Sequence, residues 1–221
     1  FELIQKLNSD FDVKICSIDG GGLRNAIPRE SSAIISFDEN NLNSFKKIMK
    51  NTSQTLLAEF KETDDNINLE FELLENRFQT IGAIESKELI NAINECPNGV
   101  FEMSENIDGL VETSNNLANI RLIEGKLKIQ CLTRSSSENS KDKLSKIISN
   151  IFENIGCDSK FSGGYPGWKP NLNSATLKEV KDSYITLFSS EPKVNVIHAG
   201  LECGIIGSHY PEMDMISFGP T

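Results

Sequence analysis

The chain has 221 residues, 38% of them hydrophobic, and a net charge of −10 from 32 acidic and 22 basic residues. The acidic excess argues against nucleic-acid binding, because clustered Lys and Arg supply the affinity for a phosphate backbone. No apolar stretch approaches the roughly 18–20 residues that a bilayer span requires. The five cysteines form no Cys-x-x-Cys pair and fit reduced thiols in a cytosol. We therefore expect a soluble cytoplasmic protein that binds neither nucleic acid nor membrane.

Hydrophobic periodicity predicts alternating strands and helices in the first third of the chain. Residues 1–7 have the pattern of a helix tail, so we expect an excised piece of a longer protein. Alternation with period two predicts strands, and apolar residues at helical spacing predict a helix with Asn40 or Asn41 as its cap. The expected elements are a strand at 11–18, a glycine turn at 20–22, a strand at 32–37, a helix at 42–60 and a strand at 67–73.

The same signals continue to the C-terminus. Ser86 is the expected cap of the next helix, and Gly156 is expected to end a later one. The elements in this part are a helix at 86–95, strands at 109–113 and 126–133, a helix at 141–155, a short strand near 160, a helix at 175–188, and strands at 194–197 and 215–218.

The order of these elements predicts an internal duplication. Residues 1–66 and 67–162 each fit a β-α-β-β-α-β unit of ferredoxin-like type, the first lacking its opening strand. We expect an α/β (α+β) fold in which an antiparallel sheet carries helices on one face. A cluster of Gly and Pro around the only Trp marks a boundary near 162–170. Residues 163–221 are predicted to be a partial α/β segment of another domain.

His198 and Glu202 form a candidate pocket wall. They flank the small residues Ala199 and Gly200 just after the predicted strand at 194–197, and ligands commonly bind at strand ends. Alternatively, His198 is a core histidine and Glu202 an acid in the first turn of a helix. A zinc site from these residues and His209 is not expected, because the intervening glycine and turn argue against one shared face.

Three further side chains are candidates for polar contacts with a ligand. Arg134 closes a predicted strand, where its guanidinium could bind a carboxylate through two parallel hydrogen bonds; a solvated arginine is the alternative. Asn25, between a glycine run and a proline, could reach a carboxylate or carbonyl, or could be an ordinary turn residue. Asn116 occupies a comparable place in the second half.

Three separate segments carry a family resemblance. They are GGGLRNAIPRE at 20–30, GGYPGWKP at 163–170 and HAGLECG at 198–204. Together they resemble the aminoacyl-histidine (Xaa-His) dipeptidases of the M20 metallopeptidase clan. The resemblance implies a lid domain of ferredoxin-like topology inserted in a catalytic domain with two zinc ions. The family's early His-x-Asp motif, its Glu-Glu pair, its further Asp and its last metal-binding His are not present in these residues.

The resemblance also implies roles for the candidate residues. Arg134 would hold the free carboxylate of a dipeptide, with Asn25 and Asn116 as further substrate contacts, while His198 and Glu202 would line the pocket. Residues 1–162 would be the lid, and 163–221 would return to the catalytic domain. We expect the chain to bind no catalytic zinc and to be inactive alone, with a dipeptide, the rest of the catalytic domain and a second copy in a homodimer as partners. The alternative function is a non-catalytic oligomerisation module.

Overall fold

The chain folds into six α-helices, one 3-10 helix and a five-stranded sheet in the part of it that the structure describes. A computed structural model describes residues 1–105, 107–164, 166–168, 171, 173–195 and 202–219. The elements, in chain order, are α1 (Glu2–Asp10), β1 (Lys14–Gly21), β2 (Ser31–Ser36), η1 (Glu39–Asn41), α2 (Leu42–Glu59), α3 (Ala83–Glu95), β3 (Gly99–Met103), β4 (Val111–Ile123), β5 (Lys126–Ser135), α4 (Glu138–Glu153), α5 (Ala175–Phe188) and α6 (Glu202–His209).

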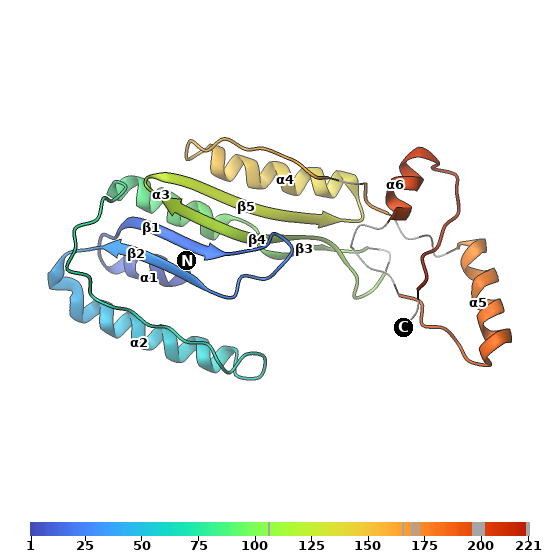
Figure 1. The fold of residues 1–221 in the computed structure, drawn as a ribbon, viewed down its shortest axis with the longest axis horizontal. Helices are drawn as coiled ribbons and strands as arrows, with labels where there is room; N and C mark the ends of the chain where they lie inside the picture. Colours follow the sequence, from blue (N-terminus) through green and yellow to red (C-terminus); the bar gives the residue numbers. More distant parts are fainter. Residues whose placement is uncertain (106, 165, 169–170, 172, 196–201, 220–221) are drawn as a thin grey trace. The chain divides into compact units, whose positions relative to one another are not determined.

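The sheet is organised around its longest strand, β4. The hydrogen-bonded order is β2-β1-β4-β3, with β5 also paired to β4, and the three pairings β1·β2, β1·β4 and β3·β4 are antiparallel (Figure 1). β1 pairs with residues 119–122 of β4, and β3 pairs with residues 111–115. A two-residue turn joins β4 to β5, and its residues Glu124 and Gly125 have φ of 51° and 75°, as a type I′ hairpin turn requires. The predicted mixed fold with an antiparallel sheet is confirmed.

The chain divides into two compact units that are interleaved in sequence. Unit 1 comprises residues 1–96, 117–131 and 151–157, and unit 2 comprises residues 97–116, 132–150 and 158–221. The predicted domain boundaries at 66 and 162 stay a prediction, as does the duplication. Both halves contain a helix, two strands and a helix in that order (α1-β1-β2-α2 and α3-β4-β5-α4), but the second half has the additional strand β3.

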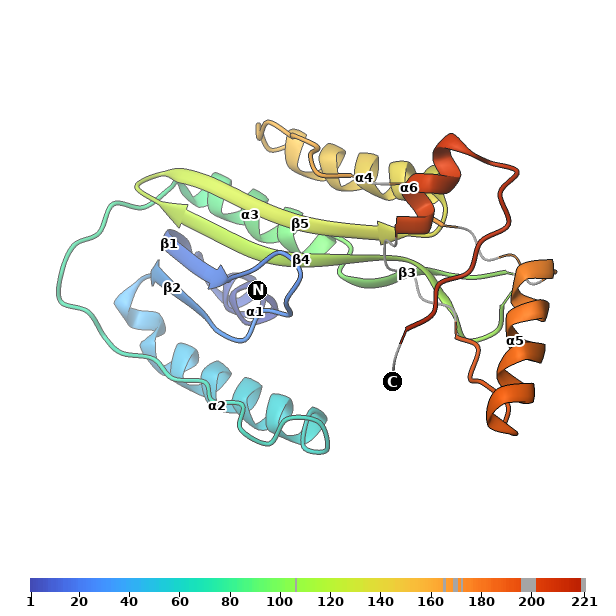
Figure 2. The ribbon, with the colours of Figure 1, turned by 45° about the vertical axis from the view of Figure 1, so that its right-hand side comes forward.

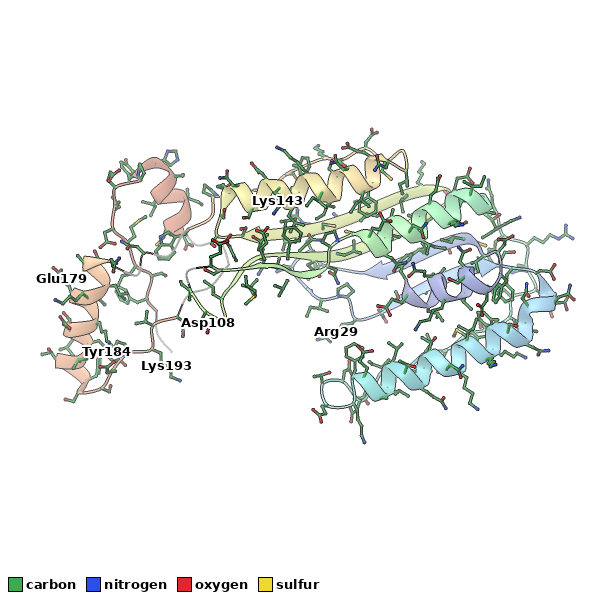
Figure 3. All side chains as sticks on the ribbon, turned by 180° about the vertical axis from the view of Figure 1, so that it is seen from behind. Arg29, Asp108, Lys143, Glu179, Tyr184 and Lys193 are labelled. Atoms are coloured by element: carbon green, nitrogen blue, oxygen red, sulfur yellow. The ribbon has the colours of Figure 1, made fainter. Side chains whose placement is uncertain are left out.

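One hydrophobic cluster of unit 1 lies between α1 and α2. α1 contacts both α2 and α3, and α3 also packs on β1. Seen from behind, α1 and α3 lie next to each other on the near side of the strands (Figure 3). The buried residues of this cluster are Leu7, Phe11, Val13, Phe45 and Met49. Fully burying one such side chain contributes about 1.5–3 kcal/mol, so this cluster is the main stabilising contact between the two helices.

An aromatic row extends this core to the segment after α2. The rings of Phe11, Phe37, Phe45 and Phe71 follow one another with centroid separations of 5.2, 5.0 and 4.9 Å. The strand predicted at 67–73 is wrong, because these residues form no ladder. Their alternation reflects side-chain packing instead, since Leu69 and Phe71 pack towards the cluster while the backbone pairs with no strand.

Ser86 does not cap α3 as predicted. The helix begins three residues earlier, with Gly82 as its N-cap, so Ser86 lies inside it and is fully buried. Its hydroxyl oxygen accepts a hydrogen bond from the N–H of Ile15 at 3.0 Å. β1 has a register shift between Ile15 and Ser17, and a buried backbone N–H at such a place needs a partner. The serine therefore supplies a backbone partner rather than a helix cap.

Gly21 allows β1 to approach β4 closely. Its φ is 78°, and a Cβ at this position would overlap the carbonyl oxygen of Ala118. Glycine meets both requirements, because it adopts positive φ without a steric penalty. The predicted glycine turn at 20–22 is consequently only partly correct, since Gly20 and Gly21 belong to β1 and the connection to β2 runs over residues 22–30.

Two thiols of unit 1 lie in contact. Cys96 caps the C-terminus of α3 and is buried, and Cys131 lies on β5. A hydrogen bond with Cys131, together with burial, raises the pKa of the Cys96 thiol.

In unit 2, a charged side chain of α4 binds to β3. Lys143, labelled on α4 in Figure 3, donates to Glu102 Oε1 at 2.6 Å and lies 5.5 Å from the ring centroid of Phe101. Hydrogen bonds from Lys143 and Ser140 lower the pKa of Glu102. The helix was predicted at 141–155 and runs from Glu138 to Glu153.

The C-terminal segment is held to α5, the helix predicted at 175–188 and found there. Ser174 caps the helix by accepting from the N–H of Leu177 at 2.9 Å. Asp214 Oδ2 accepts from Ser174 Oγ and from the N–H of Thr176, both at 2.9 Å. The strand predicted at 215–218 is wrong, because this segment pairs with no strand of the described chain and is held by these side-chain contacts. The short strand near 160 is likewise not formed.

Candidate substrate-binding site

Arg134 lies near the end of β5, where the register with β4 fixes the face that it occupies. The hydroxyls of Thr113 and Ser135 are 2.9 Å apart, and Thr133 Oγ1 donates to Asn115 Oδ1 at 3.1 Å. These pairs place Thr133 and Ser135 on the buried face. Since successive side chains of a strand alternate between faces, Arg134 lies on the opposite face. Its side chain there is half-buried.

Asn116 occupies the same face as Arg134. The two side-chain pairs on either side of Arg134 put it opposite Ser114, so Asn116 is its diagonal neighbour on β4. Such diagonal positions are about 7–8 Å apart, which is within reach of long side chains. Both residues belong to unit 2. The two side chains, a guanidinium and an amide, therefore share one face of β4 and β5, which run side by side (Figure 2).

Asn25 belongs to unit 1 and lies in the connection between β1 and β2. It is exposed, within a turn closed by the hydrogen bond from the N–H of Ala26 to the carbonyl of Leu23 at 3.1 Å. This environment fits the turn conformation considered from the sequence, and it leaves the amide accessible. Its role in binding stays a prediction.

Glu202 is the first residue of α6 and is exposed. This is the position of a first-turn acid, which the helix dipole favours. His198, Ala199 and Gly200 lie outside the described residues, as do positions 196 and 197 of the predicted strand, while Val194 and Asn195 are not in a strand. The proposed pocket wall therefore stays a prediction.

Two glycines bring the predicted motif segments together within unit 2. A Cβ at Gly167 would lie 2.7 Å from the carbonyl oxygen of Ser136 and 2.9 Å from that of Ser135. A Cβ at Gly204 would overlap the carbonyl oxygen of Pro166. Only glycine permits these approaches, so residues 166–167 contact the backbone of Ser135 and Ser136 on one side and α6 on the other.

Glu138 supplies the polar contact at the same place. Its Oε1 accepts from the N–H of Gly167 at 2.6 Å and from Lys141 Nζ at 2.7 Å. Burial opposes ionisation of this carboxyl, but the hydrogen bonds from Lys141 and Gly167 outweigh it and lower the pKa of Glu138. A charged carboxylate thus holds the Gly167 segment against the start of α4.

Two features of this region were missed by sequence reasoning. The Thr113 and Asn115 side chains are buried polar groups beside Arg134, and their alternation along β4 was the available signal. Asp214 was also missed, because nothing in the sequence connects it to Ser174 forty residues earlier.

The described side chains do not offer a metal site. Within the described ranges, no three His, Cys, Asp or Glu residues lie close enough together to hold an ion. In the same part of the chain, no helix is both long and apolar enough to cross a membrane.

Comparisons with known proteins identify relatives that are similar to this chain in sequence and in fold. Residues 1–64 match the M20_dimer family, described as Peptidase dimerisation domain. The chain is 34% identical over 212 residues to the cytosol non-specific dipeptidase of Escherichia coli (strain K12), which covers 96% of this chain. It superposes on the crystal structure of aminoacylhistidine dipeptidase from Vibrio alginolyticus with a TM-score of 0.91, over 99% of this chain at 34% identity.

The chain resembles the M20 dipeptidases. This confirms the resemblance predicted from the three motif segments. The chain spans 44% of the length of the Escherichia coli protein and 46% of the Vibrio chain, less than half of either M20 relative.

Proposed function

We propose that this chain is the substrate-closing part of a Xaa-His dipeptidase, and that Arg134 binds the free carboxylate of the dipeptide. The observation that carries the proposal is the placement of Arg134 and Asn116 as neighbours on one face of the β4–β5 hairpin. The likeness to an aminoacylhistidine dipeptidase over 99% of the chain supports the substrate class.

The chemistry of these side chains suits a carboxylate. A guanidinium can donate two parallel N–H bonds to the two oxygens of a carboxylate, and charge-assisted hydrogen bonds of this kind are the strongest in proteins. The amides of Asn116 and Asn25 can add one donor each. Fixing one end of the dipeptide positions its peptide bond for hydrolysis, which is how binding groups remote from the reacting atoms accelerate a reaction.

On the catalytic side, His198 and Glu202 would line the pocket, with Glu202 facing the ammonium group of the substrate. Two zinc ions, held by metal-binding motifs that are not among these 221 residues, would supply the hydrolytic chemistry of the whole enzyme. The described residues do not fit a metal, so the role proposed for this chain is confined to binding and orienting the substrate. The domain division at residue 162 and a cytoplasmic location are part of the same proposal.

Titration of the 221-residue chain with β-alanyl-histidine and with its C-terminal amide tests this function. We expect the free acid to shift the NMR signal of the Arg134 Nε–H group, and the amide to leave that signal unchanged. Equal shifts with both ligands, or none with either, would contradict the carboxylate role. The chain alone should release no histidine from the dipeptide and retain no stoichiometric zinc after dialysis; turnover that copurifies with it would also contradict the proposal.

A second candidate function is homodimerisation. The match of residues 1–64 to a peptidase dimerisation domain favours it, and it is compatible with substrate binding. Sedimentation equilibrium over a hundredfold range of concentration tests it. A mass that stays at 24.5 kDa throughout would exclude a dimer of this chain.

A further inference from the structure

Pairs of hydrogen-bonded polar side chains, one buried and one partly buried, flank Arg134 on both sides. The first is Thr113 with Ser135, at 2.9 Å between hydroxyl oxygens, and the second is Asn115 with Thr133, at 3.1 Å. Asn115 also donates to the carbonyl of Pro97 at 2.7 Å. Thr113 and Asn115 are 0% and 3% exposed. We call these two pairs the polar ladder.

The polar ladder has polar side chains at positions where apolar side chains of the same shape would pack equally well. A buried hydroxyl or amide gains little net stability from its hydrogen bond, because the same group bonds to water in the unfolded chain, and losing the partner costs more than the bond contributes. An apolar pair of the same shape would therefore be about as stable. What the hydrogen bonds add is direction, because they form in one register only.

Register matters here because Arg134 is on the face opposite to the ladder. A slip of β5 by one residue would exchange the two faces and turn the guanidinium towards the buried side. Each neighbour of Arg134 along β5, Thr133 and Ser135, is held to β4 by one ladder pair. The pleat at Arg134 is thus fixed from both sides.

The chain is also fixed immediately after Arg134. Ser135 Oγ accepts from the N–H of Ser137 at 3.0 Å, and the N–H of Ser136 donates to the carbonyl of Glu112 at 3.2 Å. The close approach of Gly167 to the carbonyls of Ser135 and Ser136 leaves this turn little room to move. These contacts therefore hold the turn between β5 and α4 in one conformation.

We propose that Thr113 and Asn115 are positioning residues for Arg134, acting through the polar ladder to hold its guanidinium towards the substrate carboxylate. This inference rests on the proposed function of Arg134. It assigns to two buried residues of β4 a role in carboxylate recognition without any contact to the ligand.

The test compares the affinities of the chain for β-alanyl-histidine and for its C-terminal amide, measured by NMR titration. A purely structural role would change both affinities equally, whereas a positioning role lowers the preference for the free acid. Thr113→Val removes one hydroxyl without changing the shape, and Thr113→Ser keeps it. The matched control is Thr52→Val, because Thr52 is also buried, at 5% exposure, but lies on α2 in unit 1.

We expect Thr113→Val to reduce the preference for the free acid at least about threefold, because a bidentate contact between a guanidinium and a carboxylate depends on the orientation of the guanidinium. Thr113→Ser should restore the preference, and Thr52→Val should leave it unchanged. If Thr113→Val does not fold, the double variant Asn115→Leu with Thr133→Val decides, because it removes both partners of the second pair and is expected to show the same loss.

The proposed function of Arg134 and the positioning role of Thr113 and Asn115 are contradicted by different results. A wild-type chain without preference for the free acid would overturn the function of Arg134 and the inference with it. A wild-type preference that the ladder variants retain in full would overturn the inference alone.

Discussion

The α1–α2 core of unit 1 and the strand ends of unit 2 are held together by different forces. Between α1 and α2, the cluster consists of apolar and aromatic side chains. Around Arg134, hydrogen bonds between hydroxyls, an amide and backbone groups connect β4 to β5 and to the turn that leads to α4. Apolar packing tolerates small shifts, whereas hydrogen bonds impose one geometry. The difference suggests that unit 1 provides stability and that the end of β5 provides orientation.

Phe45→Ala should cause the largest loss of stability. Phe45 is 6% exposed and contacts the rings of both Phe37 and Phe71, and replacing a buried Phe by Ala costs about 3–5 kcal/mol. Urea unfolding followed by circular dichroism measures the loss. Phe161→Ala is the matched control, because that ring is 65% exposed, and its free energy of unfolding should stay within about 0.5 kcal/mol of wild type. Equal losses of stability in both variants would contradict the conclusion that the α1–α2 cluster stabilises the chain.

Arg134→Ala should affect binding instead of stability. A charge-assisted hydrogen bond contributes about 1.5–3 kcal/mol, so the affinity for the free-acid dipeptide should fall by roughly ten- to hundredfold. The affinity for the amide and the urea midpoint should barely change. Arg121→Ala provides the control, since Arg121 lies on the same hairpin but pairs with Asp19 at 3.0 Å on the surface. A large drop in the urea midpoint of Arg134→Ala would show that the residue is structural.

Ser174→Ala should have a smaller effect confined to unit 2. It removes the N-cap of α5 and the donor to Asp214, and losing a serine cap typically costs about 1 kcal/mol. Hydrogen exchange of the first turns of α5 should accelerate, while exchange in α2 should not. Thr186→Ala, an exposed change inside the same helix, should not accelerate it. Faster exchange in α2 would mean that the two regions are not independent.

The smallest expected effect is a pH dependence from Asp214. Hydrogen bonds from the N–H of Thr176 and from Ser174 lower the pKa of Asp214 below its ordinary value of 3.8. A depressed pKa contributes stability above the ordinary value, and the contribution disappears as the pH falls through the folded pKa. The difference in Tm between wild type and Asp214→Asn should therefore be constant above about pH 5 and should shrink below about pH 4. A difference that grows on acidification would exclude this role.

Sequence reasoning was most successful where the period of apolar residues determines the element. The helix at 175–188 was predicted to the residue, and α2 to within one residue, because apolar side chains recur along one face of each. Sequence reasoning failed at two places where a side-chain contact produces a pattern that resembles a strand or a helix cap. Residues 67–73 alternate like a strand but only pack, and Ser86 resembles a cap but bonds to Ile15 of β1.

The candidate site was predictable in part, and for a physical reason. The chemistry of Arg134 and Asn116 is visible in the sequence, but their shared face depends on the register of β5 against β4, which Thr113 and Thr133 fix through partners about 20 residues away. Asn25 and Glu202 lie on exposed turns and helix ends, where local signals for structure and for binding are the same.

The contact between Cys96 and Cys131 has a practical consequence for labelling. The thiolate is the reactive form of cysteine, so a thiol with a raised pKa reacts slowly with alkylating reagents. Burial raises the pKa of Cys16 in the same way, so Cys16 and Cys96 should both react slowly with a maleimide. A spectroscopic probe attached to Cys203 would sit in α6, one residue from the glycine that touches Pro166, and would report on that contact without the need for an introduced cysteine.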